Sequence, residues 1–144
     1  MKIDPIDQAV ISQGLLASAR EMGAKLIRSA YSTILREARD GSAAILDRHG
    51  NVVAQADLIP LQLGPISETF KPCAALTPPE DLEEDDFYIN NNPFEGGQHL
   101  PDVYIFSPIF VEDSLVGFSA SVAHHLDLGG GAPGMNPNAT DIHQ

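Results

Sequence analysis

The sequence is poor in three features, and each shortage excludes a class of protein. Cys73 is the only cysteine, which excludes an internal disulfide and a cysteine-based zinc cage. Lysine and arginine total 8 against 20 aspartate and glutamate, a formal charge of −12, and such a chain repels the phosphate backbone of nucleic acids. The longest apolar run without a charge, residues 103–111, is far shorter than the roughly 20 residues of a membrane-spanning helix. We therefore expect neither a nucleic-acid nor a membrane partner.

The remaining composition fits one globular domain. A chain of 144 residues with 43% apolar content can bury a real core. Its first eight residues carry Asp4 and Asp7 and lack the basic start and apolar run of a secretory signal. Together with the single thiol, this predicts a cytoplasmic protein.

The first quarter of the chain has the period of a helix. Apolar residues recur every three to five positions from Pro5 to about Glu37, namely Ile6, Val10, Leu15, Ala19, Met22, Leu26, Ala30 and Ile34. This spacing predicts one long helix, in which Pro5 is acceptable in the first turn. Asp40 and Gly41 then break the pattern.

Short apolar runs dominate the rest of the chain. We expect a hairpin of strands 43–46 and 52–55, a short helix with Ile66, Phe70 and Ala74 on one face, a strand at 87–90, and a second hairpin of strands 102–111 and 115–123. Pro108 cannot donate a ladder hydrogen bond, so it belongs at an edge or a bulge. The predicted fold class is α+β, with the long N-terminal helix packed on a mainly antiparallel sheet.

The residues that can carry chemistry are concentrated in two segments. Gln98-His99-Leu100-Pro101-Asp102 and His124-His125-Leu126-Asp127 hold three of the five histidines. If the second hairpin turns between residues 113 and 114, Asp102 faces His125, and a shift of half a residue places it opposite His124 or Leu126. Every one of these registers brings the histidine pair beside Asp102, because opposed side chains have Cβ atoms within about 5.5 Å. Pro101 forces the chain out of helix and leaves His99 on the adjoining turn.

This cluster suits a single metal ion. Two imidazoles and one carboxylate leave coordination positions open, as in sites for Fe(II), Mn(II) or catalytic Zn(II). Asp127, three residues past His124, can accept the ring N–H of a ligating histidine and fix its tautomer. From spacing alone two alternatives stay open, namely histidines that only satisfy loop backbone groups and histidines that act as unliganded acids and bases.

Two other features have simpler interpretations. Gly129, Gly130 and Gly131 match neither a P-loop nor a dinucleotide fingerprint, so we expect a flexible loop. Cys73 has no His or Asp neighbour in the sequence and falls on a helix face, which predicts a packed thiol rather than a nucleophile.

Five segments, in order, resemble the hydantoinase B family, which includes the C-terminal part of ATP-dependent 5-oxoprolinases and the related large subunit of acetone carboxylases. They are Arg36-Glu37-Ala38-Arg39-Asp40, the run 46–55 (LDRHGNVVAQ), the run 92–102 (NPFEGGQHLPD), the run 124–130 (HHLDLGG) and Pro133-Gly134. The family usually has Asp-Pro where Asn92-Pro93 stands, and a Gly-Asp pair near Asp85-Asp86. Its members are several times longer, so we expect residues 1–144 to be the N-terminal part of a truncated hydantoinase B/oxoprolinase domain.

The resemblance implies a function. In the family the metal is carried by residues that match His99, Asp102 and His124, with the second-strand signature keeping a histidine first, and we assign Asp127 as the supporting catalytic carboxylate. A separate hydantoinase A-type subunit uses ATP to phosphorylate a cyclic amide, and the metal-bearing subunit completes hydrolysis. The expected cofactor is one divalent ion, Mn, Fe or Zn.

Two alternatives to a hydantoin- or lactam-opening hydrolase follow from the same resemblance and from the chain length. The chain could belong to an acetone-carboxylase-like subunit, or it could be a non-catalytic structural fragment of such a complex. In each case we expect a homo-oligomer or a hetero-oligomer, because short apolar strands without a closing sequence leave edges that need covering.

Overall fold

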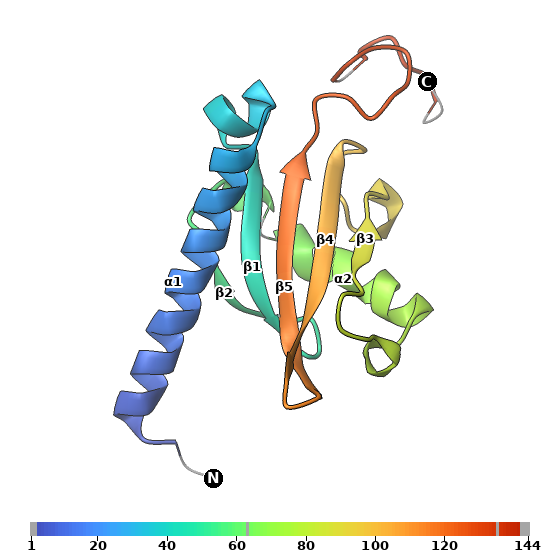
Figure 1. Ribbon diagram of the computed structural model, residues 1–144. Helices are drawn as coiled ribbons and strands as arrows, with labels where there is room; N and C mark the ends of the chain where they lie inside the picture. Colours follow the sequence, from blue (N-terminus) through green and yellow to red (C-terminus); the bar gives the residue numbers. More distant parts are fainter. Residues whose placement is uncertain (1–2, 63, 135, 142–144) are drawn as a thin grey trace.

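An antiparallel sheet with a helix on each face forms the frame of the domain (Figure 1). The computed structural model describes residues 3–62, 64–134 and 136–141. Within these residues, five strands have the order β2-β1-β5-β4-β3, and each neighbouring pair is antiparallel. The predicted α+β class, with a long N-terminal helix and an antiparallel sheet, is confirmed.

The bounds of the strands lie within two residues of those that the sequence predicts. The helices and strands are α1 (Pro5–Ser29), β1 (Gly41–Asp47), β2 (Val52–Gln55), α2 (Gly64–Leu76), β3 (Tyr88–Asn90), β4 (Asp102–Val111) and β5 (Ser114–His124). Short helical turns are η1 (Ile34–Ala38), η2 (Pro60–Gln62), η3 (Pro79–Asp81) and η4 (Pro93–Glu95). Among the described residues, no helix combines the length and the apolar character needed to cross a membrane.

Helix α1 starts as predicted and ends earlier than predicted. The Asp4 side chain accepts a hydrogen bond from the N–H of Ile6, and Pro5 occupies the first turn. The helix ends at Ser29, because Ala30 has an extended backbone, and a separate π-helical turn, η1, follows. The break has a packing reason, since it brings the buried side chain of Leu35 back against Gly41 at the start of β1.

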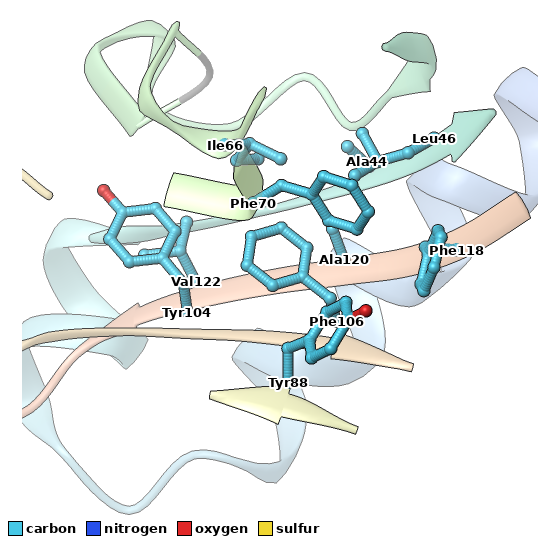
Figure 2. Close-up of a cluster of buried hydrophobic side chains, with 10 residues drawn as sticks. All are labelled: Ala44, Leu46, Ile66, Phe70, Tyr88, Tyr104, Phe106, Phe118, Ala120 and Val122. Atoms are coloured by element: carbon cyan, nitrogen blue, oxygen red, sulfur yellow. The ribbon is translucent and has the colours of Figure 1, made fainter. Parts of the chain in front are cut away.

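The main core lies between the sheet and α2 (Figure 2). Phe70 of α2 meets the rings of Tyr88, Phe106 and Phe118 edge-on, with ring centroids 5.7, 5.4 and 4.7 Å away. Alternation along the strands places residues of even number in β1, β4 and β5 on this face. The predicted face of the short helix is confirmed, because Ile66 and Phe70 are buried and Ala74 packs beside them.

The opposite face is covered by α1. Ala19 packs against Ile45 of β1 and Ala54 of β2, with Leu15 and Met22 beside it. The first turns of α1 extend beyond this contact, where Ile6 and Val10 are exposed. Helix α1 is therefore anchored to the sheet by its C-terminal half.

The β4–β5 hairpin sets the register of the candidate site. Val111 pairs with Ser114 around a turn of Glu112 and Asp113, one position earlier than the assumed turn. A bulge then shifts the pairing, so that the open end of the hairpin places Asp102 directly opposite His124. Pro108 lies next to this bulge and beyond the part of β4 that pairs with β3, as its missing N–H requires.

Candidate metal centre

Asp102 is the centre of the cluster and is fully buried. Its Oδ1 lies 2.8 Å from Nδ1 of His124, which is the facing residue on β5. Its Oδ2 lies 3.0 Å from Nδ1 of His99 and also accepts the His99 backbone N–H at 3.1 Å. One carboxylate therefore holds both imidazoles and closes the turn that carries His99.

The three side chains present their donor atoms to one point. One atom from each of His99, Asp102 and His124 lies within 4.8 Å of the others. The two imidazole rings are 5.6 Å apart at an interplanar angle of 72°. The His124 side chain is only 8% exposed, whereas that of His99 is 42% exposed, so the cluster is closed on the strand side and open on the side of His99. The structure thus brings together the three residues expected as metal ligands.

The charge of the cluster supports a cation as its occupant. Asp40 places Oδ2 at 3.7 Å from Nδ1 of His124, so two carboxylates flank one buried imidazole. In the described part of the chain, neither Asp40 nor Asp102 has a lysine or arginine partner within ion-pair distance. Buried carboxylate charge is unfavourable without compensation, and a protonated imidazole or a bound cation can supply it. Two imidazole nitrogens with carboxylate oxygen form a donor set that fits Zn, Fe or Mn.

The neighbouring candidates lie outside this cluster. The side chain of His125 is exposed, and its backbone N–H donates to the Pro101 carbonyl at 2.9 Å. Asp127 is also exposed, on the loop after β5, where Oδ1 accepts the backbone N–H of Gly129 at 2.8 Å. Of the residues searched, the group whose ligand atoms converge contains neither of them.

Two residues of this region, Asp40 and Gln62, were not predicted from the sequence as part of the site. Asp40 precedes β1, and its carbonyl accepts the backbone N–H of His124, because β1 pairs with β5. Asp40, His124 and Asp102 consequently form a row across three adjacent strands. Gln62 is buried and donates through Nε2 to Asp40 Oδ1 at 3.1 Å. Neither contact has a local sequence signal, since the pairing of β1 with β5 joins distant parts of the chain.

A cavity adjoins the open side of the cluster. It has a volume of about 550 Å³, and His99 is part of its wall. Leu100, Leu126 and Leu128 supply apolar wall, and Asn91, Pro101 and the glycine-rich loop after β5 complete the lining. A small molecule bound in this cavity would lie beside the exposed imidazole of His99.

Two further titratable groups are held in their neutral forms. Burial, followed by the nearby carboxylate of Asp102, raises the pKa of Tyr104 far above its ordinary value. Burial raises the pKa of the Cys73 thiol as well, and its Sγ donates to the Thr69 carbonyl at 3.4 Å. The packed thiol predicted for Cys73 is confirmed.

The fold and the cluster define a class of protein, an α+β domain with a His-Asp-His group able to hold one divalent metal ion beside a small-molecule cavity. Residues 4–144 match the hydantoinase B/oxoprolinase family. The chain belongs to this family.

Similar proteins include one named as a hydantoinase subunit and one named as a 5-oxoprolinase. The chain is 39% identical over 136 residues to a Pseudomonas sp. (strain NS671) protein assigned as the B-type component of a D-/L-hydantoinase, and the match covers 92% of this chain and 23% of the relative. It is 36% identical over 146 residues to the 5-oxoprolinase of Saccharomyces cerevisiae (strain ATCC 204508 / S288c), covering 100% of this chain and 11% of that protein. The chain thus spans about a quarter or less of the length of these relatives.

Solved structures share the fold. The ATP-dependent caprolactamase from Pseudomonas jessenii superposes with a TM-score of 0.73 at 26% identity, over 86% of this chain and 21% of that chain. Acetone carboxylase in its nucleotide-free form superposes with a TM-score of 0.77 over 86% of this chain and 16% of the other. At 21% identity, this second likeness is one of fold.

Proposed function

We propose that the chain forms the metal-bearing part of an ATP-dependent cyclic amidohydrolase that opens a hydantoin or lactam ring. The observation that carries the proposal is the convergence of His99, Asp102 and His124 beside a cavity. The names of the relatives supply the substrate class, since hydantoinase, 5-oxoprolinase and caprolactamase all act on cyclic amides.

Each residue of the cluster has a separate task in this proposal. Asp102 fixes the orientation of both imidazoles through its two oxygens, and His124 closes the buried side. His99 faces the cavity, where it meets the ring that is to be opened. When bound, a divalent ion of Mn, Fe or Zn would supply a Lewis acid that polarises the amide carbonyl or activates water. Asp127 is proposed as the supporting carboxylate from the loop after β5.

The proposal also includes a partner protein. The relative from Pseudomonas sp. (strain NS671) is named as one component of a hydantoinase with several subunits, which implies a further component of the hydantoinase A type. That component would use ATP to phosphorylate the cyclic amide, while the present chain would position the activated ring and its attacking water. An acetone-carboxylase-like activity is the alternative, and it differs by a requirement for bicarbonate.

Metal analysis tests the proposal directly. The protein is purified without chelator, and its metal content is compared with that of the His124→Ala variant. We expect about one divalent ion per chain in the wild type and almost none in the variant. Equal metal content in both proteins would overturn the assignment of the site.

A second measurement tests the reaction class. The chain is combined with a hydantoinase A-type subunit and ATP, and ring opening of 5-oxoproline, hydantoin and caprolactam is followed with and without bicarbonate. Hydrolysis that is independent of bicarbonate supports the amidohydrolase. Carboxylation would favour the alternative enzyme, and a complex whose activity is unchanged when this chain is omitted would make the chain a structural fragment.

A further inference from the structure

We propose that Gln62 is a positioning residue which, anchored by Tyr104, fixes the Asp40 carboxylate beside His124. The three side chains form one hydrogen-bonded relay. The Tyr104 hydroxyl donates to Oε1 of Gln62 at 3.3 Å, and Nε2 of Gln62 donates to Oδ1 of Asp40 at 3.1 Å. The other oxygen of Asp40, Oδ2, then lies 3.7 Å from Nδ1 of His124.

The chemistry of the three groups favours one orientation of the Gln62 amide, in which it accepts from Tyr104 and donates to Asp40, over the flipped orientation. An ionised carboxylate only accepts hydrogen bonds, so the Gln62 amide must present its NH₂ group to Asp40. The amide carbonyl then points the other way and needs a donor, which the single hydroxyl proton of Tyr104 provides. A flipped amide would oppose two acceptor oxygens at Asp40. Tyr104 therefore fixes the orientation of Gln62, and Gln62 fixes the orientation of Asp40.

Burial makes the relay effective. Gln62 is 1% exposed and Tyr104 is fully buried, so water cannot replace either partner, and a lost contact would leave a buried polar group unpaired. Only a few polar side chains of the described residues are buried to this degree, and Asp102 of the metal centre is one of them. Gln62 thus occupies a position at which an apolar residue would otherwise be expected.

The turn that carries Gln62 is tied to the site at a second point. The Gln98 side chain donates through Nε2 to the carbonyl of Leu61 at 2.9 Å, and Gln98 directly precedes His99. The turn η2 thereby contacts both the residue before β1 and the segment that carries His99. This position, between β2 and α2, links the segment that precedes β1 to the segment that carries His99.

The relay itself can be tested without metal. Hydrogen exchange of side-chain amides is measured by NMR on the metal-free chain, with the exposed Gln55 amide as the internal reference. We expect the Gln62 amide to exchange at least about tenfold more slowly than that of Gln55, and Tyr104→Phe to remove most of this protection. Tyr88→Phe is the matched control, because it deletes a hydroxyl that donates to the Thr77 carbonyl at 2.6 Å, away from the site. A Gln62 amide that exchanges as fast as that of Gln55, or that is indifferent to Tyr104→Phe, would overturn the inference.

The effect on the site rests on the proposed function and is tested with Mn²⁺ alone. Gln62→Met keeps the size of the side chain and removes both hydrogen bonds, so we expect affinity for Mn²⁺ to fall about tenfold. If Gln62 acts through Asp40, the same substitution in an Asp40→Asn background should change affinity less than about twofold, as a double-mutant cycle reports. The control Gln55→Met should leave the affinity for Mn²⁺ unchanged, because Gln55 is exposed.

The outcomes separate this inference from the proposed function. If Gln62→Met lowered the affinity for Mn²⁺ equally in the wild-type and Asp40→Asn backgrounds, or in neither, Gln62 would not act through Asp40. The metal site would still stand. A wild-type chain that binds no Mn²⁺ would remove the metal site, and the exchange measurement alone would then decide whether the relay exists. Thermal melting of each variant identifies any that fail to fold, in which case Tyr104→Phe, which removes a single oxygen, takes the place of Gln62→Met in the cycle.

Discussion

Asp102 and His124 face each other on β4 and β5, and Oδ1 of Asp102 lies 2.8 Å from Nδ1 of His124 in a fully buried contact. His99 joins the same carboxylate through its other oxygen. Because a carboxylate with two imidazoles provides only three protein donors, removal of one should leave too few for stable binding. We therefore predict that His99→Ala, Asp102→Ala and His124→Ala each abolish metal retention, as measured by elemental analysis after dialysis.

His125→Ala is the control for this set. The His125 side chain is exposed and lies next in sequence to the proposed ligand His124, and because it is outside the cluster its removal should leave the metal content unchanged. Loss of metal in His125→Ala with retention in His124→Ala would mean that the register of the hairpin is off by one residue. Retention in all four variants would refute the site.

Asp127→Asn should have a milder effect than the loss of a ligand. A carboxylate that supports a ligand without binding the metal typically contributes about 10–100-fold to affinity or activity. Asparagine can still accept the N–H of Gly129, so the substitution removes charge and keeps the turn. Titration with Mn²⁺ measures the change, and an affinity equal to that of the wild type would exclude Asp127 from the site.

Two glycines should respond in opposite directions to the same substitution. Gly50 has φ of 84°, and a Cβ there would collide with the Phe70 ring, so Gly50→Ala should destabilise the domain by about 2 kcal/mol or more. Gly14 lies within α1 with nothing within 4 Å of an added Cβ, so Gly14→Ala should stabilise it by about 0.5–1 kcal/mol. Urea unfolding of both variants checks the signs, and a neutral Gly50→Ala would mean that the first hairpin does not pack on α2.

The first hairpin should contribute to stability in a pH-dependent way. Burial alone would raise the pKa of Asp47, but hydrogen bonds from Asn51 and His49 outweigh it and lower that pKa below its ordinary value. A lowered pKa in the folded state means that the contribution is complete above the unfolded value of about 4 and is lost as the pH falls through the folded value. The difference in melting temperature between wild type and Asp47→Asn should therefore shrink below about pH 4. A difference that stays constant with pH would contradict this account.

The sequence predicts contacts whose partners lie close together along the chain. The alternation of 102–111 and 115–123 predicted β4 and β5, and it restricted the residue opposite Asp102 to three neighbours, of which the structure selects His124. The predicted end of α1 was wrong because Ala30 and Ile34 continue the helical spacing of apolar residues. Packing of Leu35 on Gly41 favours a break in the helix instead. Such packing is a tertiary effect that periodicity does not encode.

Asp40 and Gln62 were not predicted as site residues because they reach the site through contacts between distant segments of the chain. Asp40 reaches His124 only because β1 pairs with β5 rather than with β4, and this choice depends on the whole sheet. Gln62 reaches Asp40 from a turn that follows β2. Gln62 has no motif that would separate it from an ordinary surface polar residue, and the segment 36–40, which contains Asp40, does not by itself indicate a contact with His124.

The bulge beside Pro108 shifts the pairing of β4 with β5 by one residue and so compensates for the position of the turn. At the turn, Val111 pairs with Ser114, and past the bulge Ile109 pairs with Gly117, so Val116 is the extra residue. Because successive side chains point to opposite faces, one residue more or less in β5 between the turn and His124 would turn the His124 side chain toward α1 instead of α2 and place one of its sequence neighbours opposite Asp102. The tip of the hairpin lies at the far end of both strands from the cluster, yet its length decides which of two adjacent histidines meets Asp102. Relatives in which the tip is longer or shorter by one residue should therefore carry an offsetting change in the bulge, and this parity can be read from their sequences alone.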